Sequence, residues 1–165
     1  VHTSASPFMK KKKIIKIVLL VGFACIIIGG SFAYYLFNKP HRDVRSAKVD
    51  YTLNATDLVT EYLTNPVLAN EKYLSDEGDS KILSISGKVH SISLDLNNQQ
   101  VVLLKGQGDK AGVSCTFTAT TNDHASQLKV GQMVTVKGVI RSGAGYDKDL
   151  QLYEDVILEK CDVIN

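Results

Sequence analysis

A run of 21 residues without a charged side chain, residues 17–37, constrains this chain more than any other feature. At about 1.5 Å per helical residue the run is about 30 Å long, which is enough to cross the hydrocarbon core of a bilayer. Tyr34 and Tyr35 lie near its end, where aromatic side chains gather at a membrane interface. We therefore expect one transmembrane helix, or uncleaved signal anchor, over residues 17–37.

The charges around this run predict its orientation. Lysines occupy positions 10–13 and 16 before it, whereas only Lys39 directly follows it, and all 17 acidic residues come later. By the positive-inside rule, the basic residues 1–16 are cytoplasmic and the rest of the chain is outside. This predicts a single-pass protein of the inner (cytoplasmic) membrane with an extracytoplasmic, periplasmic C-terminal domain.

A cleaved signal peptide has the same order of basic and apolar residues, and Ser31-Phe32-Ala33 loosely resembles a cleavage site. The run is longer than the usual apolar core of a signal peptide, which favours a retained anchor over cleavage, and both alternatives stay open. The residues before Cys25 do not form a lipoprotein signal. Residues 1–8, ahead of Met9, show no pattern and are treated as a candidate artefact.

After the apolar run, the hydrophobic pattern divides the chain into three parts. Residues 38–50 are polar and have no period, so we expect a linker. Residues 51–79 carry apolar side chains at helical spacing and predict a short helical preface, which a turn at residues 76–79 closes. Over residues 80–165 the period becomes two, which is typical of strands.

Two helices are expected in the preface. Asn54 or Thr56 could cap the first, and Pro66 fits the first turn of the second. We expect Leu68 and Tyr73 of the second helix to face inward.

The last part predicts a mostly β domain with the order β-β-β-α-β-β. The expected strands are residues 81–96, 100–105, 112–119, 132–141 and 150–158, with one short helix over residues 122–129. In the first strand the apolar parity changes past Gly87, which implies a β-bulge or sharp bend. Five strands with a long bent first one and a helix after the third match the five-stranded OB-fold barrel.

Five short motifs accompany these elements: Ala69-Asn70-Glu71-Lys72-Tyr73, Ser86-Gly87-Lys88-Val89, Leu128-Lys129-Val130-Gly131-Gln132, Val134-Thr135-Val136-Lys137-Gly138 and Leu158-Glu159-Lys160-Cys161. Through them, the stretch from about Asn54 to Val163 resembles the bacterial tRNA-anti-like family of OB-fold proteins. The resemblance implies a barrel of anticodon-binding ancestry, in a family whose members often carry a signal or a membrane anchor. None of the motifs is a catalytic signature, so the resemblance transfers no function.

Two cysteines of the predicted domain are candidates for a disulfide bond. Cys115 lies on the inward parity of the third strand and Cys161 just past the fifth, and these strands are neighbours in an OB barrel. A bond between them would close a loop of about 45 residues and contribute up to ~4 kcal/mol by the loop-entropy account. The alternative is two buried, reduced thiols that act as small hydrophobic side chains.

Patterns of metal and catalytic sites are missing from the sequence. His41, His90 and His124 are scattered, and no Cys-x-x-Cys or His-x-x-x-His motif occurs. Serines alternate along one predicted strand without the base and orienting group that a nucleophile needs. The sequence therefore predicts no catalytic residue, no metal ligand, no cofactor and no enzyme activity.

The candidate ligand-binding residues are two tyrosines in or beside the loop between the fourth and fifth strands, a common binding edge of OB domains, and three basic residues that add charge near the same face. The set comprises Lys88, Lys137, Arg141, Tyr146 and Tyr153. From His41 onward, 13 basic residues face 17 acidic ones, a balance of −4 that argues against binding to phosphate backbones. We expect a module that binds an envelope protein, glycan or small molecule; the alternatives are an oligonucleotide-binding domain and a structural envelope component.

Overall fold

The computed structural model describes residues 7–37, 43–75 and 79–164. The chain divides into two compact units, Val1–His41 and Arg42–Asn165. Parts of three predicted segments lie outside the described residues: the first six residues of the basic N-terminus, the start of the linker at residues 38–42, and the turn at residues 76–78.

The first unit contains one helix, α1 (Pro7–Phe37). Within it, Ile14–Tyr35 has a mean hydropathy of 2.5 and is long and apolar enough to cross a membrane, a test that a signal sequence also meets. Its described side chains are exposed. The helix ends at the residue where the apolar run ends, and it begins ahead of the run because the lysines before it are also good helix formers.

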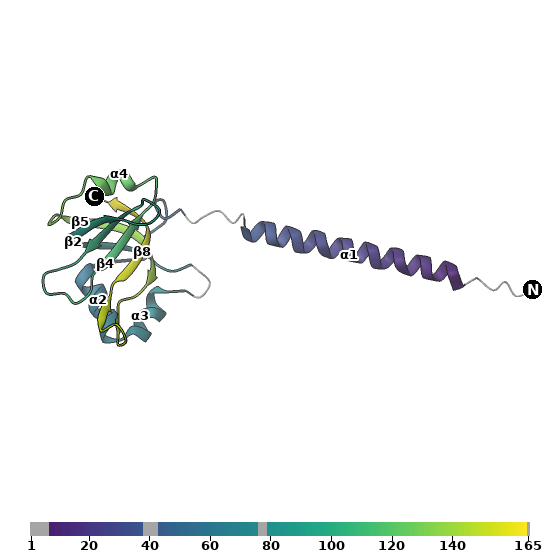
Figure 1. Ribbon diagram of the computed structural model, residues 1–165, viewed down its shortest axis with the longest axis horizontal. Coiled ribbons are helices and arrows are strands. Elements are labelled where there is room, and N and C mark those ends of the chain that lie inside the picture. The colour runs from purple at the N-terminus through teal and green to yellow at the C-terminus, as the bar shows by residue number, and fades with distance from the viewer. Residues whose placement is uncertain (1–6, 38–42, 76–78, 165) are drawn as a thin grey trace, which may run out of the picture. The chain divides into compact units, whose positions relative to one another are not determined.

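The second unit is a closed five-stranded barrel, as the OB-fold prediction requires (Figure 1). The strands follow one another around the barrel in the order β2 (Ile82–Leu94), β3 (Gln100–Leu104), β4 (Val113–Phe117), β8 (Val156–Ile164) and β5 (Met133–Ser142). β5 pairs back onto β2, and only the β4–β8 pair of the barrel is parallel. α4 (Asn122–Ser126) lies at one end of the barrel, and two further helices, α2 (Ala55–Thr64) and α3 (Pro66–Tyr73), lie at the other (Figure 1).

The long strand β2 bends as predicted. Its first half pairs with β5 and its second half with β3, and the β2–β3 register shifts between Val89 and Ser91. This bulge moves the apolar parity to the opposite phase, so that Ile92 packs against the core, whereas Leu94 at the end of the strand is 59% exposed. β2 ends at Leu94, however, so Leu96 is fully exposed in a turn, where Asp95 accepts hydrogen bonds from two backbone N–H groups.

The two helices of the preface begin where the sequence predicts. Asn54 caps α2, because its side-chain oxygen accepts a 2.8 Å hydrogen bond from the backbone N–H of Asp57, and Pro66 opens α3. Leu68 is 60% exposed, contrary to the prediction, and Ala69 is buried instead together with Tyr73. With only eight residues, α3 offers too few apolar positions to define its buried face from sequence.

A short strand, β1 (Tyr51–Asn54), precedes α2 and pairs parallel to the first half of β2. The sequence does not predict this strand, since four residues are too few for a periodic pattern. Through β1 and the two helices, residues 51–73 share one hydrophobic core with the barrel, in which Tyr62, Tyr73 and Phe117 are the largest buried side chains.

The end of the chain also differs from the prediction of one strand over residues 150–158. A separate hairpin is formed by β6 (Gly145–Asp147) and β7 (Leu152–Glu154), and β8 then runs to Ile164. Leu158 and Cys161 are both buried with two residues between them, because Lys160 adopts a positive φ of 53°. This irregularity breaks the alternation, which is why the sequence pattern stops at Leu158.

Candidate functional site

The five residues predicted to bind a ligand do not form one site. Lys88 pairs in register with Met133 at the start of β5, whereas Arg141 lies eight residues further along the same strand. At about 3.3 Å per residue, these two positions are about 26 Å apart. Arg141 is exposed and its Nε lies 3.8 Å from a carboxylate oxygen of Glu159, so its charge is already paired on the surface.

Lys137 is engaged by the protein itself. Its side chain is buried at 8% exposure, and Nζ donates hydrogen bonds to the backbone carbonyls of Arg45, at 2.9 Å, and Ala47. These carbonyls belong to residues 43–47, which we call the strap. Lys137 therefore holds the strap against the barrel, a contact that the sequence could not reveal because the two segments are about 90 residues apart.

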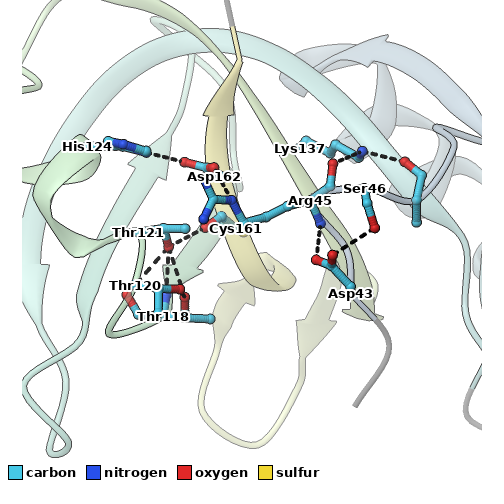
Figure 2. A network of polar contacts seen from close by, with 11 residues as sticks. Asp43, Arg45, Ser46, Thr118, Thr120, Thr121, His124, Lys137, Cys161 and Asp162 are labelled. Atoms are coloured by element: carbon cyan, nitrogen blue, oxygen red, sulfur yellow. Dashed lines mark hydrogen bonds and ion pairs between the residues drawn. The ribbon is translucent and has the colours of Figure 1, made fainter. Parts of the chain in front are cut away.

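A second set of contacts holds the strap from β8 (Figure 2). Asp162 is the register partner of Lys137. Its Oδ2 forms an ion pair with Nε of Arg45 at 3.1 Å, and its Oδ1 lies 2.6 Å from Nδ1 of His124 in α4. Within the strap, the carboxylate of Asp43 accepts hydrogen bonds from the Ser46 hydroxyl and from the backbone N–H of Arg45. These hydrogen bonds lower the pKa of the Asp43 carboxyl.

An open cleft of about 660 Å³ lies beside the strap. It is lined by Asp43, Arg45, Ser46, Thr120, Lys137, Asp162 and Ile164. Two cations and two carboxylates line it, and Arg45, Lys137 and Asp162 are each bonded to protein partners. The cleft is thus neutral, and its groups stabilise the strap.

Replacing Lys137 by methionine tests this assignment. The substitution keeps the length of the side chain but removes both hydrogen bonds to the strap, so we expect the free energy of unfolding to fall by about 2 kcal/mol. Tryptic cleavage after Arg45 should become faster, because the strap leaves the barrel more often. Lys88→Met, on an exposed position of β2, is the matched control and should change stability by less than about 0.5 kcal/mol. Unchanged cleavage in Lys137→Met would contradict the assignment.

The structure does bring Tyr146 and Tyr153 together. They are cross-strand partners in the β6–β7 hairpin, with ring centroids 4.8 Å apart and a tilt of 51° between the rings. Their side chains remain 49% and 36% exposed. Nζ of Lys110, from the loop between β3 and β4, lies 5.3 Å from the centroid of the Tyr153 ring. The sequence does not predict Lys110 as a neighbour of these tyrosines, because only the fold places its loop beside the hairpin.

The charge at this end of the barrel is slightly negative. The β3–β4 loop and the hairpin segment carry three basic residues, Lys105, Lys110 and Lys148, against five acidic ones, Asp109, Asp147, Asp149, Glu154 and Asp155. A surface of this sign repels phosphate backbones. We call Tyr146, Tyr153 and Lys110 the tyrosine edge.

The outer face of β2, β3 and β4 is the surface with which OB domains commonly bind oligonucleotides. Past the β2 bulge its side chains are small or aliphatic: Ser91, Ser93, Val101, Leu103, Ser114 and Thr116; before it, Lys88 and His90 of β2 are exposed. None of these six is aromatic or charged, whereas binding of single strands relies on aromatic stacking in a basic groove. This face is therefore poorly suited to nucleic acid.

A second opening, a groove of about 570 Å³, lies along α2 and α3. Within it, Glu61 forms a 3.0 Å ion pair with Lys72 and accepts a 2.8 Å hydrogen bond from the Tyr73 hydroxyl. Burial raises the pKa of Glu61, but these two partners outweigh it and hold the pKa below its ordinary value. The carboxylate stays ionised and paired at neutral pH, so it is not poised to transfer a proton.

The remaining predicted site residues are the two cysteines. Cys115 lies in β4 and Cys161 in β8, and both are buried, free thiols. Within the described part of the chain, no three His, Cys, Asp or Glu side chains come together as metal ligands.

Comparison with known proteins gives a family and a fold. Residues 9–156 match the tRNA_anti-like family. Among solved structures, the chain is similar to a candidate nucleic acid-binding lipoprotein from Klebsiella pneumoniae subsp. pneumoniae MGH 78578, with 16% identity and a TM-score of 0.50 over 76% of this chain and 99% of that one. At that identity the likeness shows a shared fold. No curated protein matches the chain.

Proposed function

The chain belongs to the tRNA_anti-like family, and from this premise we propose that it is a membrane-anchored, extracytoplasmic binding module with the tyrosine edge as its recognition surface. The proposed ligand is a protein, glycan or small molecule of the cell envelope. The observation that carries the proposal is the exposed pair of Tyr146 and Tyr153 on the loop between the last two barrel strands. Loops at this position form a binding edge in OB folds, and tyrosine supplies a large, rigid contact surface.

The membrane anchor in this proposal is residues 17–37, with residues 1–16 in the cytoplasm and the barrel outside. The length and apolarity of Ile14–Tyr35 support a span, and the lysines ahead of it support the orientation. The description of the Klebsiella pneumoniae structure as a lipoprotein is consistent with an envelope location for this fold.

The proposed role is non-enzymatic. The buried or half-buried charged groups nearest the two openings are engaged in structural contacts, as for Glu61 with Lys72 and for Asp162 with Arg45. A general base or nucleophile needs a group whose proton or lone pair is available to a substrate. The tyrosine edge offers stacking and hydrogen bonding, which suit recognition.

Oligonucleotide binding is the second candidate, because the Klebsiella pneumoniae structure is described in those terms. The slightly negative charge of the β3–β4 loop and hairpin segment around the tyrosine edge, and the uncharged outer face of β3 and β4, disfavour it. A fluorescence titration of the full chain in detergent with single-stranded DNA and RNA at low salt separates the two functions. We expect no saturable binding, and tight binding that weakens steeply with salt would replace our proposal.

An in-cell crosslinking experiment tests the tyrosine edge directly. A photo-crosslinking amino acid at the exposed Leu152, next to Tyr153 in β7, is expected to give a discrete adduct with an envelope component. Tyr146→Ala with Tyr153→Ala should lower the adduct yield at least about tenfold, because truncating an aromatic anchor commonly costs about 2 kcal/mol or more. The matched control carries the crosslinker at Thr116 on the outer face of β4. Equal adducts at both positions, or an unchanged yield in the double variant, as a purely structural component predicts, would refute the proposal.

A further inference from the structure

The two cysteines of the barrel unit lie on neighbouring strands. β4 and β8 run parallel, with Cys115 opposite Leu158 and Phe117 opposite Cys161. Cys115 and Phe117 point to the same side of β4, because side chains two residues apart in a strand share a face. Both cysteine side chains are completely buried in the core.

An irregularity in β8 brings Cys161 to the core. The register of the β4–β8 pair shifts between Cys115 and Phe117, and Lys160 has a φ of 53°. Together these place Leu158 and Cys161 on the inner face with two residues between them. A regular strand would have directed Cys161 to the opposite face from Leu158, away from Cys115.

The Cys161 thiol contacts the Cys115 thiol on one side and Gly138 on the other. Burial raises the pKa of the Cys161 thiol well above its ordinary value, and a hydrogen bond with the Cys115 side chain adds to the shift. On the other side, a β-carbon at Gly138 would lie only 2.7 Å from Sγ of Cys161. Position 138 therefore holds a glycine where Cys161 needs its space.

We propose that Cys115 and Cys161 form an intrachain disulfide bond that joins β4 to β8 in the exported protein. This inference rests on the proposed function for the compartment, because disulfides persist outside the cytoplasm and are rare within it. In the reaction, a thiolate of one cysteine attacks the disulfide of an oxidising thiol–disulfide oxidoreductase. The second cysteine then attacks this mixed disulfide and displaces the sulfur of the oxidoreductase. The two electrons and the two protons of the cysteine pair leave with the oxidoreductase, which is released as its pair of thiols.

The burial of the two sulfur atoms determines when the disulfide bond forms and how fast it is reduced. The sulfur atoms are out of reach in the folded barrel, so oxidation precedes the docking of β8, the last element of the chain. Once the barrel has closed, the same burial keeps reductants away from the bond. We expect reduction to be at least about tenfold slower in the folded chain than in the unfolded chain.

The test uses the full chain with Cys25→Ser, which removes the third cysteine and leaves only the pair. Cells are quenched with acid, and the protein is unfolded and treated with a maleimide reagent before or after reduction. We expect no label before reduction and two labels after it, with an unreduced mass lower by two hydrogen atoms. Cys115→Ala in the same background is the control, and its lone Cys161 should be labelled without reduction.

A second sample separates this inference from the proposed function. The purified chain is reduced in denaturant and refolded in detergent with oxidised glutathione, where compartment plays no part. A bond in both samples supports the proposal. A bond in the refolded sample alone would overturn the extracytoplasmic placement while upholding the pairing. Two free thiols in both samples would overturn the pairing and leave the placement untouched.

Discussion

Two arginines at the centre of residues 17–37, Ile26→Arg with Ile27→Arg, are expected to release the protein from the membrane. Each charged residue at the middle of a span costs about 2.5–3.5 kcal/mol on the insertion scale, so the pair costs about 5–7 kcal/mol. Both isoleucines are exposed on a helix whose apolar segment spans 22 residues, so no packing within the described chain shields them. The measurement is the share of the full chain that stays in carbonate-washed membranes.

The matched control places the same charges at the end of the span. In Ile14→Arg with Ile15→Arg, the new side chains lie beside the existing lysines, and long cationic side chains can reach the interface from there. This variant should remain in the membrane. If the central variant also remained in the membrane, α1 would not be the anchor. If both variants were soluble, the loss of membrane retention would not depend on the depth of the arginines in the bilayer.

Replacing Gly143 by alanine is expected to lower the free energy of unfolding of the barrel by about 3 kcal/mol, at the upper end of what overpacking usually costs. A β-carbon at this position would lie 1.9 Å from Cε1 and 2.1 Å from Cδ1 of Tyr62. The Tyr62 ring cannot yield easily, since it is 1% exposed and its centroid is 6.1 Å from that of the buried Tyr73 ring. Chemical unfolding of the full chain in detergent, followed by near-ultraviolet circular dichroism, measures the loss.

Gly145→Ala is the control for this substitution, two residues further along. There the nearest atom to a new β-carbon is a carboxylate oxygen of Glu154 at 3.6 Å, an ordinary contact, so stability should change by less than about 0.5 kcal/mol. Because Gly143 leads into the β6–β7 hairpin, the strained variant should also lose crosslinking at Leu152. Equal stability of the two variants would show that the hairpin does not depend on the close packing of Gly143 against Tyr62.

The barrel could be predicted from sequence because its pattern is local. Alternating residues such as Val113, Cys115 and Phe117 define a strand within five positions, and all three are buried. The parity change in β2 revealed the bulge before Ser91 for the same reason. Where the backbone itself departs from alternation, as at Lys160, the pattern ends too early and the true extent of β8 is lost.

The candidate site was predicted less well, because its contacts join distant segments. Tyr146 and Tyr153 could be placed near each other in advance, since both lie in or beside the predicted loop between the fourth and fifth strands. Lys110 lies over the Tyr153 ring only because the order of the strands places its loop there. Lys137 donates hydrogen bonds to backbone carbonyls of the strap, and no side-chain pattern in the sequence predicts where these carbonyls lie. A lysine on a predicted strand face looks the same in sequence whether it binds a ligand or a carbonyl group of its own chain.

The proposed function requires that the barrel lie outside the cytoplasmic membrane on a single span. Protease added to intact spheroplasts that produce the full chain with an epitope after residue 165 tests it most directly, with a cytosolic protein as the integrity control. We predict loss of the epitope while the cytosolic control stays whole. An epitope that survives until the spheroplasts are lysed would place the barrel in the cytoplasm and contradict the account.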